Sequence, residues 1–212
     1  MIEIRNLTKR FGKHQALDGV TLEIAPGEGV ILIGQNGAGK TTLIRTLLGE
    51  YRPDSGYVRI DGFDPLKDRA GALEEVAFVP QLPPPIRLSV AELLEYAAIG
   101  GQADSAAIED YCQHMDLDLA AHKNKIFFRL SGGMKQKLLI AIALARKAQL
   151  LIFDEPTANL DPLGRERFYE ILHEKRAQQT HLFVSHRIEE LKNLASRAVE
   201  MDLGKVVRDE KL

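Results

Sequence analysis

The sequence has a single cysteine, no long hydrophobic run and almost no net charge, and each shortage excludes a class of protein. Cys112 has no second cysteine to pair with, so an internal disulfide framework is impossible and a structural zinc site is not expected. We expect Cys112 to be a small, partly buried apolar residue, and low cysteine usage is compatible with the cytosol. Lys and Arg number 28 against 30 Asp and Glu, a net charge of −2, so no basic field predicts nucleic-acid binding.

Membrane-spanning and secretory signals are also missing from the sequence. The longest apolar run, residues 138–145, is well below the roughly 18 residues that a spanning helix requires. The first residues alternate and include an acid, Glu3, which is wrong for a signal peptide. We therefore expect a soluble chain with no direct insertion into the bilayer, so that any role at a membrane needs a partner protein.

The pattern of apolar residues predicts an α/β fold in 212 residues, a length typical of one domain or two small ones. Strand-like runs alternate with helical segments, which predicts a mostly parallel sheet covered by helices. Residues near 85–147 have helical but few strand signals and are interpreted as an inserted helical subdomain. Strands are expected at 2–7, 20–24, 30–33, 57–60, 76–79, 150–153, 181–184, 198–201 and 206–207, and helices at 41–48, 90–99, 106–115, 132–146, 164–176 and 188–196.

A glycine-rich loop follows the buried strand at 30–33 and precedes a helix. Glycines let backbone N–H groups curl around phosphate oxygens, and the helix N-terminus adds its positive dipole end. Lys40 can reach the β- and γ-phosphates, the Thr41 hydroxyl is a hard ligand for magnesium, and Thr42 should contact the α-phosphate. The flanking strand and helix disfavour the alternative of a turn with incidental glycines. The loop matches Gly-x4-Gly-Lys-Ser/Thr at every fixed position: Gly34, Gln35, Asn36, Gly37, Ala38, Gly39, Lys40 and Thr41.

Two acids, Asp154 and Glu155, follow an apolar run at 150–153 where a buried strand leaves the sheet. Ligands of open α/β sheets bind at this carboxyl edge. A magnesium nucleotide needs a carboxylate for the metal's water shell and a group that orients the attacking water. We predict the first role for Asp154 and the second for Glu155. Alone, the acids could equally form a solvated turn; the phosphate loop in the same chain favours the site.

Together these motifs resemble the ATP-binding subunit of ABC transporters over nearly the whole chain. The phosphate loop resembles the family's Walker A motif and residues 150–155 its Walker B motif. Residues 130–134 resemble the signature that separates this family from other P-loop proteins. The other matching positions occur in the family's order: the aromatic that stacks on adenine (Phe11), the Q-loop glutamine (Gln81), the D-loop aspartate (Asp161) and the switch histidine (His186).

The resemblance implies a P-loop NTPase fold. A RecA-like core with an N-terminal antiparallel β subdomain would comprise residues 1–84 and 148–212, and a helical signature subdomain would lie near 85–147. It implies ATP and Mg²⁺ as ligands, and an active ATPase. The residues that it assigns to catalysis are Lys40, Gln81, Glu155 and His186, and those that it assigns to the metal are Thr41, Gln81 and Asp154. Departures from the family pattern (Met134 for Gln, Gln149 for Pro, Phe11 for Tyr) leave the catalytic residues intact.

The resemblance also implies a head-to-tail dimer, either of this chain or with a paralogous ATPase. The signature opens a helix, so its exposed N–H groups and hydroxyl form a second anion site. Ser131, Gly132 and Gly133 of one chain would contact the γ-phosphate held by the other, and Asp161 would reach across the seam. The alternative for the signature is an ordinary helix N-cap.

Three functions remain open at this point. The first is a transport ATPase, cytoplasmic and peripheral on the inner face of the cell membrane, with an integral membrane permease docking near residues 82–100. Within it, the stretches 131–136 and 34–39 favour export over import. The second is a soluble ABC ATPase, for example in cluster assembly. The third is a nucleotide switch without turnover, against which the intact Glu155 argues.

Overall fold

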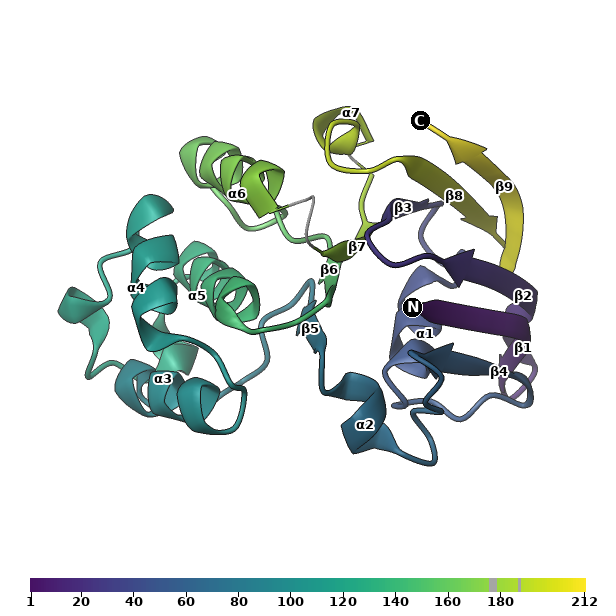
Figure 1. The fold of residues 1–212 in the computed structure, drawn as a ribbon, viewed down its shortest axis with the longest axis horizontal. Coiled ribbons are helices and arrows are strands. Elements are labelled where there is room, and N and C mark those ends of the chain that lie inside the picture. Colours follow the sequence, from purple (N-terminus) through teal and green to yellow (C-terminus); the bar gives the residue numbers. More distant parts are fainter. Residues whose placement is uncertain (176–178, 187) are drawn as a thin grey trace.

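The computed structural model describes residues 1–175, 179–186 and 188–212, and these ranges contain two sheets (Figure 1). The smaller sheet has the order β2-β1-β4 and the larger β5-β6-β7-β3-β8-β9. The strands are β1 (Ile2–Phe11), β2 (His14–Ile24), β3 (Gly29–Ile33), β4 (Ser55–Ile60), β5 (Val76–Val79), β6 (Leu150–Asp154), β7 (Thr180–Val184), β8 (Arg197–Asp202) and β9 (Lys205–Lys211). The helices are α1 (Lys40–Leu47), α2 (Arg69–Leu73), α3 (Val90–Ile99), α4 (Ser105–His114), η1 (Ala120–His122), η2 (Phe127–Arg129), α5 (Gly132–Ala145), α6 (Pro162–Lys175) and α7 (Ile188–Leu191).

The smaller sheet is antiparallel, because β1 pairs with both β2 and β4 in opposite directions. The first two strands form a hairpin in which Phe11 lies opposite His14. The sequence predicted shorter strands here, ending at Leu7 and starting at Val20. Register shifts along β1 after Ile4 and Leu7 interrupt the alternation of apolar and polar residues, so the periodicity stops before the pairing does.

The larger sheet brings the ends of three strands to one edge. β3, β6 and β7 run parallel, and Val184 pairs with both Leu32 and Asp154. The segments that leave these strands are the glycine-rich loop at 34–39, the acids after β6 and the residues after Val184. They therefore start side by side, as expected for a ligand site at the carboxyl edge of a parallel sheet.

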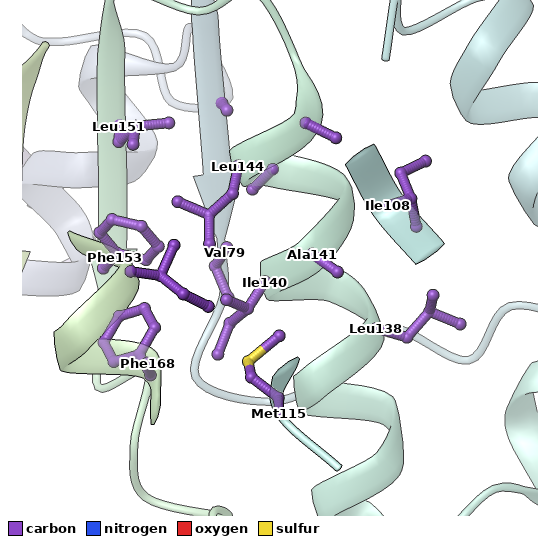
Figure 2. Packing of buried hydrophobic residues seen from close by; sticks show 14 of the residues in the cluster. Val79, Ile108, Met115, Leu138, Ile140, Ala141, Leu144, Leu151, Phe153 and Phe168 are labelled. Atoms are coloured by element: carbon purple, nitrogen blue, oxygen red, sulfur yellow. The ribbon is translucent and has the colours of Figure 1, made fainter. Parts of the chain in front are cut away.

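The core beside β6 is apolar and closely packed (Figure 2). Phe153 packs edge-on against Phe168 at 5.4 Å between ring centroids and stacks on Phe183 at 5.5 Å. Leu144 and Ile140 project from α5 toward this group. Each fully buried side chain of this size contributes about 1.5–3 kcal/mol, so α5 and β6 are held in a fixed relation.

The hairpin of β8 and β9 lies against the glycine-rich loop. The N–H of Gly204, in the turn between these strands, donates to the Ala38 carbonyl at 3.1 Å. A Cβ at Gly34 would lie 2.2 Å from the Met201 carbonyl oxygen, so the loop approaches β8 too closely for any side chain there. The β8–β9 hairpin thus packs against the glycine-rich loop and supports it.

Several predicted boundaries differ from the structure. The five-residue α2 was not expected, because one helical turn and a half is too short to show a period. The helix expected at 188–196 ends at Leu191, because the chain turns there so that the Ser196 N–H can donate to the Gly29 carbonyl beside β3. The helix expected at 164–176 starts earlier, at Pro162, and residue 176 lies outside the described residues. Cys112 is buried, as expected, and burial raises its pKa to about 12.

Candidate functional site

A pocket of about 480 Å³ opens where the glycine-rich loop meets the ends of β6 and β7. Most of the residues predicted to bind nucleotide line it. Three others that line it, His14, Ala16 and Val184, were not predicted. The predicted residues in its wall are Phe11, Asn36, Gly37, Ala38, Gly39, Lys40, Thr41, Thr42, Gln81, Asp154, Glu155 and His186.

The glycine-rich loop takes a shape that requires glycine. Gly34, Gly37 and Gly39 have φ angles of 143°, 87° and 101°, in the left-handed region that other residues rarely enter. Gly39 is the N-cap of α1 and offers no side-chain acceptor to the first turn. The early N–H groups of α1 are therefore left for another acceptor at the pocket wall, which is how helix N-termini bind anions.

Lys40 is almost fully buried at the base of this loop, with 8% of its surface exposed. Its Nζ donates to the backbone carbonyls of Gly34, at 2.5 Å, and Gln35, at 3.0 Å. Gly34 and Gln35 therefore support the lysine rather than line the pocket. Burial lowers the pKa of Lys40, while the acids Glu155 and Asp154 oppose that shift.

Asp154 is the buried acid of the pocket, with 6% of its surface exposed. Burial and the neighbouring Glu155 raise its pKa, whereas Lys40 and Arg45 act in the opposite direction. A bound cation stabilises an ionised carboxylate in such surroundings. Thr41 supplies a hydroxyl oxygen to the same pocket. A carboxylate beside a hydroxyl is a donor set that fits Mg²⁺, which binds few protein oxygens and keeps phosphate and water ligands.

Glu155 has a strained backbone and an unsatisfied side-chain atom. Its φ is +47°, a conformation that costs a non-glycine residue on the order of 1–3 kcal/mol. Its N–H donates to the Val184 carbonyl at 2.9 Å, which holds it against the end of β7. Its buried Oε1 finds no hydrogen-bond partner among the described residues and lies 3.4 Å from His186 Nε2. The two side chains thus face each other in the pocket, with a carboxylate oxygen available to a ligand or water.

Phe11 lines the pocket and is 45% exposed. Its ring packs edge-on against Tyr51 at 5.2 Å, and Lys9 Nζ lies 5.2 Å from the ring centroid. The exposed aromatic ring in the pocket wall is a surface on which a planar ligand can stack. His14 pairs with Phe11 across the β1–β2 hairpin. The short turn at Gly12 and Lys13 could have predicted this pairing, and with it the place of His14 in the pocket wall.

The signature residues Ser131, Gly132 and Gly133 do not line this pocket, and neither does Asp161. Ser131 caps α5, with its Oγ accepting from the Met134 N–H at 3.2 Å. Asp161 Oδ1 instead lies 3.1 Å from Lys137 Nζ. The structure therefore gathers the Walker-type, Q-loop and switch residues within the chain and leaves the signature residues outside.

A second hollow of about 490 Å³ adjoins the first and shares Thr41, Gln81 and Asp154 with it. Its wall combines apolar side chains, including Ile44 and Phe78, with the charged Arg45, Glu50 and Asp154. Exposed apolar side chains lie at its rim and on α3: Leu82, Tyr96 and Ile99. Within residues 1–175, 179–186 and 188–212, no helix is both long and apolar enough to cross a membrane.

A family model described as ABC transporter matches residues 17–158 of the chain. The chain belongs to this family. It is 36% identical to a putative ABC transporter ATP-binding protein of Methanosarcina mazei, over 99% of this chain and 43% of that protein. It is 34% identical to Nod factor export ATP-binding protein I of Burkholderia lata and 32% identical to an aliphatic sulfonates import ATP-binding protein of Pseudomonas syringae, over 98% of this chain and 70% and 73% of those proteins.

Solved structures agree with the family assignment. An ATP-binding subunit of an ABC transporter superposes with a TM-score of 0.89 at 28% identity, covering 100% of this chain and 90% of the other. A dimeric ATP-binding cassette in a post-hydrolysis state, bound to ADP and Pi, gives 0.85 at 27% identity, covering 100% and 99%. The predicted P-loop fold and ABC-type ATPase family are thus confirmed. The chain spans less than half the length of the methanosarcinal relative.

Proposed function

We propose that this chain binds ATP with Mg²⁺ in the 480 Å³ pocket and hydrolyses it as the ATP-binding subunit of a transporter. Family membership supports nucleotide binding. The observation that carries the proposal is that a single pocket brings together four reactive side chains from distant parts of the sequence: Lys40, Asp154, Glu155 and His186.

The phosphates bind in the glycine-rich loop. N–H groups from the loop and the first turn of α1 donate to phosphate oxygens, and Lys40 adds a positive charge at the β- and γ-phosphates. Phe11 offers a ring face to the base. Magnesium supplies charge stabilisation at the phosphate oxygens. Thr41, Asp154 and Gln81 are the residues that would hold it.

Glu155 and His186 act on the attacking water. Glu155 Oε1 is buried and without a hydrogen-bond partner among the described residues, so it can accept a proton from a water at the γ-phosphate. His186, 3.4 Å away, orients that water and the γ-phosphate through its ring nitrogen. The left-handed backbone at Glu155 aims its side chain into the pocket.

Two chains complete each site. Ser131, Gly132, Gly133 and Asp161 lie outside the pocket of their own chain, and Ser131 is exposed at the start of α5. A head-to-tail dimer, with a copy or a paralogue, would place Ser131, Gly132 and Gly133 on the γ-phosphate held by the partner chain, with Asp161 at the seam between the chains. The dimeric cassette that resembles this chain supports such an assembly.

Glu155→Gln tests the hydrolytic assignment. The amide cannot accept the water's proton, so we expect steady hydrolysis to fall by about a thousandfold while ATP binding persists. The variant should then accumulate as an ATP-bound dimer, visible as a doubled mass in size-exclusion chromatography with light scattering. Turnover at the wild-type rate would refute the role of Glu155, and Glu166→Gln, an exposed change on α6, is the matched control.

We further propose that residues 85–147 form a helical subdomain and that an integral membrane permease docks near residues 82–100, over the second hollow. The apolar side chains of its wall and the exposed Leu82, Tyr96 and Ile99 support this site. The chain would then be peripheral on the cytoplasmic face of the membrane. Export is favoured by the stretches 131–136 and 34–39, and relatives named for export and for import are both similar to the chain.

Co-purification from membranes tests the partner. Tyr96→Asp should release the chain from a membrane subunit while leaving its basal ATPase rate unchanged, because Tyr96 is absent from the pocket wall. Recovery of the wild-type chain only in a soluble complex would contradict the transport role. Uptake into inverted vesicles, against uptake into right-side-out vesicles, would then give the direction.

A further inference from the structure

The loop between β6 and α6, residues 155–161, contacts three parts of the site. It begins with Glu155 in the pocket. In its middle, Asn159 Nδ2 donates to the Gln81 backbone carbonyl at 3.3 Å. The Asn159 carbonyl oxygen lies 3.1 Å from where a Cβ of Gly133 would be, so the loop also touches the first turn of α5. The β6–α6 loop therefore connects the pocket to the signature.

The end of this loop is fixed by a lysine that no motif assigns. Lys137 lies on α5, one turn after Gly133, and only 9% of its side chain is exposed. Its Nζ lies 3.1 Å from Asp161 Oδ1. The pKa of Asp161 is lowered, chiefly by the hydrogen bond from Lys137. A charge buried to this degree is strongly unfavourable without its partner, so the pair resists separation.

The packing around this ion pair leaves no room for adjustment. A Cβ at Gly164 would lie 2.7 Å from Asp161 Oδ1 and 2.8 Å from Lys137 Cε. Next to Lys137, the amide of Gln136 is fully buried, and neither of its polar atoms has a hydrogen-bond partner among the described residues. A buried amide without a hydrogen-bond partner is unfavourable.

We propose that Lys137 is a positioning residue: by holding Asp161 it fixes the β6–α6 loop, and so couples Glu155 in one pocket to the signature surface that completes the other. This inference rests on the proposed function. Lys137 touches no nucleotide in this arrangement. Because Lys137 fixes one end of the β6–α6 loop, a movement at the signature surface changes the position of Glu155 at the other end. Glu155 therefore becomes aligned when the signature surface closes on a partner chain.

Lys137→Met tests the coupling, because methionine keeps the length of the side chain and removes its charge. We expect ATP affinity of the single chain, measured with a fluorescent ATP analogue, to stay within about twofold, and kcat to fall about tenfold, equivalent to 1.4 kcal/mol. Lys137→Arg should restore kcat. Lys137→Met combined with Asp161→Asn should be no slower than the slower single variant, because both changes break one interaction. Lys147→Met, an exposed lysine beyond α5, is the matched control.

Amide hydrogen exchange provides a readout that does not need turnover. The N–H groups of Ala158 and Leu160 donate to carbonyls within the loop, and that of Glu155 donates to Val184 of β7. We expect the exchange of these three groups to rise about tenfold in Lys137→Met, with β6 unchanged. Unchanged protection of the loop, or a kcat that arginine does not restore, would overturn the inference. A wild-type chain without ATPase activity would instead contradict the proposed function, and hydrogen exchange would still decide the role of Lys137.

Discussion

Helices α1 and α5 both have glycines at or beside their first residue, and their N-termini are built differently. At α1, the N-cap is Gly39 in a left-handed conformation, without a side-chain cap, and the buried charges of Lys40 and Asp154 lie beside it. At α5, the N-cap is the exposed Ser131, in an extended conformation, and its hydroxyl caps its own helix. The first terminus has the features of an anion site within the chain, whereas the second offers N–H groups and a hydroxyl at the surface.

Under the proposed function, this difference would explain why one chain can bind ATP by itself but needs a second chain to hydrolyse it. Buried charge gives affinity, because a cation and N–H groups act together at low dielectric. Exposed N–H groups add little in water and gain strength when a partner excludes the solvent. We therefore expect changes at α1 to affect binding and changes at α5 to affect turnover.

The largest effect is expected for Lys40→Ala. Loss of Lys40, the one lysine that the described residues contribute to the pocket wall, removes a positive charge from the phosphate site, so hydrolysis should fall about a thousandfold and ATP affinity should fall with it. Isothermal titration and a steady-state assay measure the two. If Lys40→Ala bound ATP as tightly as the wild type, the expectation that changes at the N-terminus of α1 affect binding would be wrong.

Low pH should destabilise the larger sheet, which lies beside the N-terminus of α1. His181 on β7 is buried and stacks on Phe183, and burial lowers its pKa to about 4 from the usual value of 6.5. The unfolded chain therefore binds the proton first, so the stabilisation is complete above pH 6.5 and is lost as the pH falls toward 4. The loss amounts to about 3 kcal/mol in the free energy of unfolding.

Urea unfolding at several pH values measures this loss. His181→Leu removes the titrating group, and its stability should vary less between pH 7 and pH 4.5. A variant curve parallel to that of the wild type would show that His181 does not titrate in this range.

At the second terminus, Ser131→Arg should leave ATP binding by the single chain within about twofold and lower kcat about a hundredfold, because a bulky cation blocks the surface that meets the partner. An equal loss in binding and turnover would place Ser131 in its own chain's pocket. Mixing this variant with Lys40→Ala tests the pairing further: one of the two sites in a mixed dimer then retains both intact halves, so some activity should return.

The smallest effect is expected for Met134→Gln, which restores the residue usual in the family. Met134 contributes its N–H to the Ser131 cap, and glutamine keeps that N–H. Steady-state kinetics should show kcat and KM within about twofold of the wild type. A larger change would mean that the side chain at this position, and not the backbone alone, contacts the ligand.

The sequence predicts the pocket well because its parts are short motifs on strands that a parallel sheet must align. Lys40, Asp154 and His186 each follow a buried strand, so their meeting at one edge could be inferred. The Lys137–Asp161 ion pair could not, because it depends on how α5 packs against the start of α6. The same applies to His14 and to the carbonyls that hold Lys40: they depend on tertiary contacts and backbone direction, which residue spacing does not encode.

The hairpin behind the glycine-rich loop has a consequence for biosynthesis. The loop leaves the ribosome more than 150 residues before the turn at Gly204 that supports it. A nascent chain therefore contains the complete phosphate-binding motif long before the β8–β9 hairpin can hold that motif rigid. Nucleotide capture should start only after residues 197–211 emerge and pair, which protects an unfinished ATPase from binding ATP during translation.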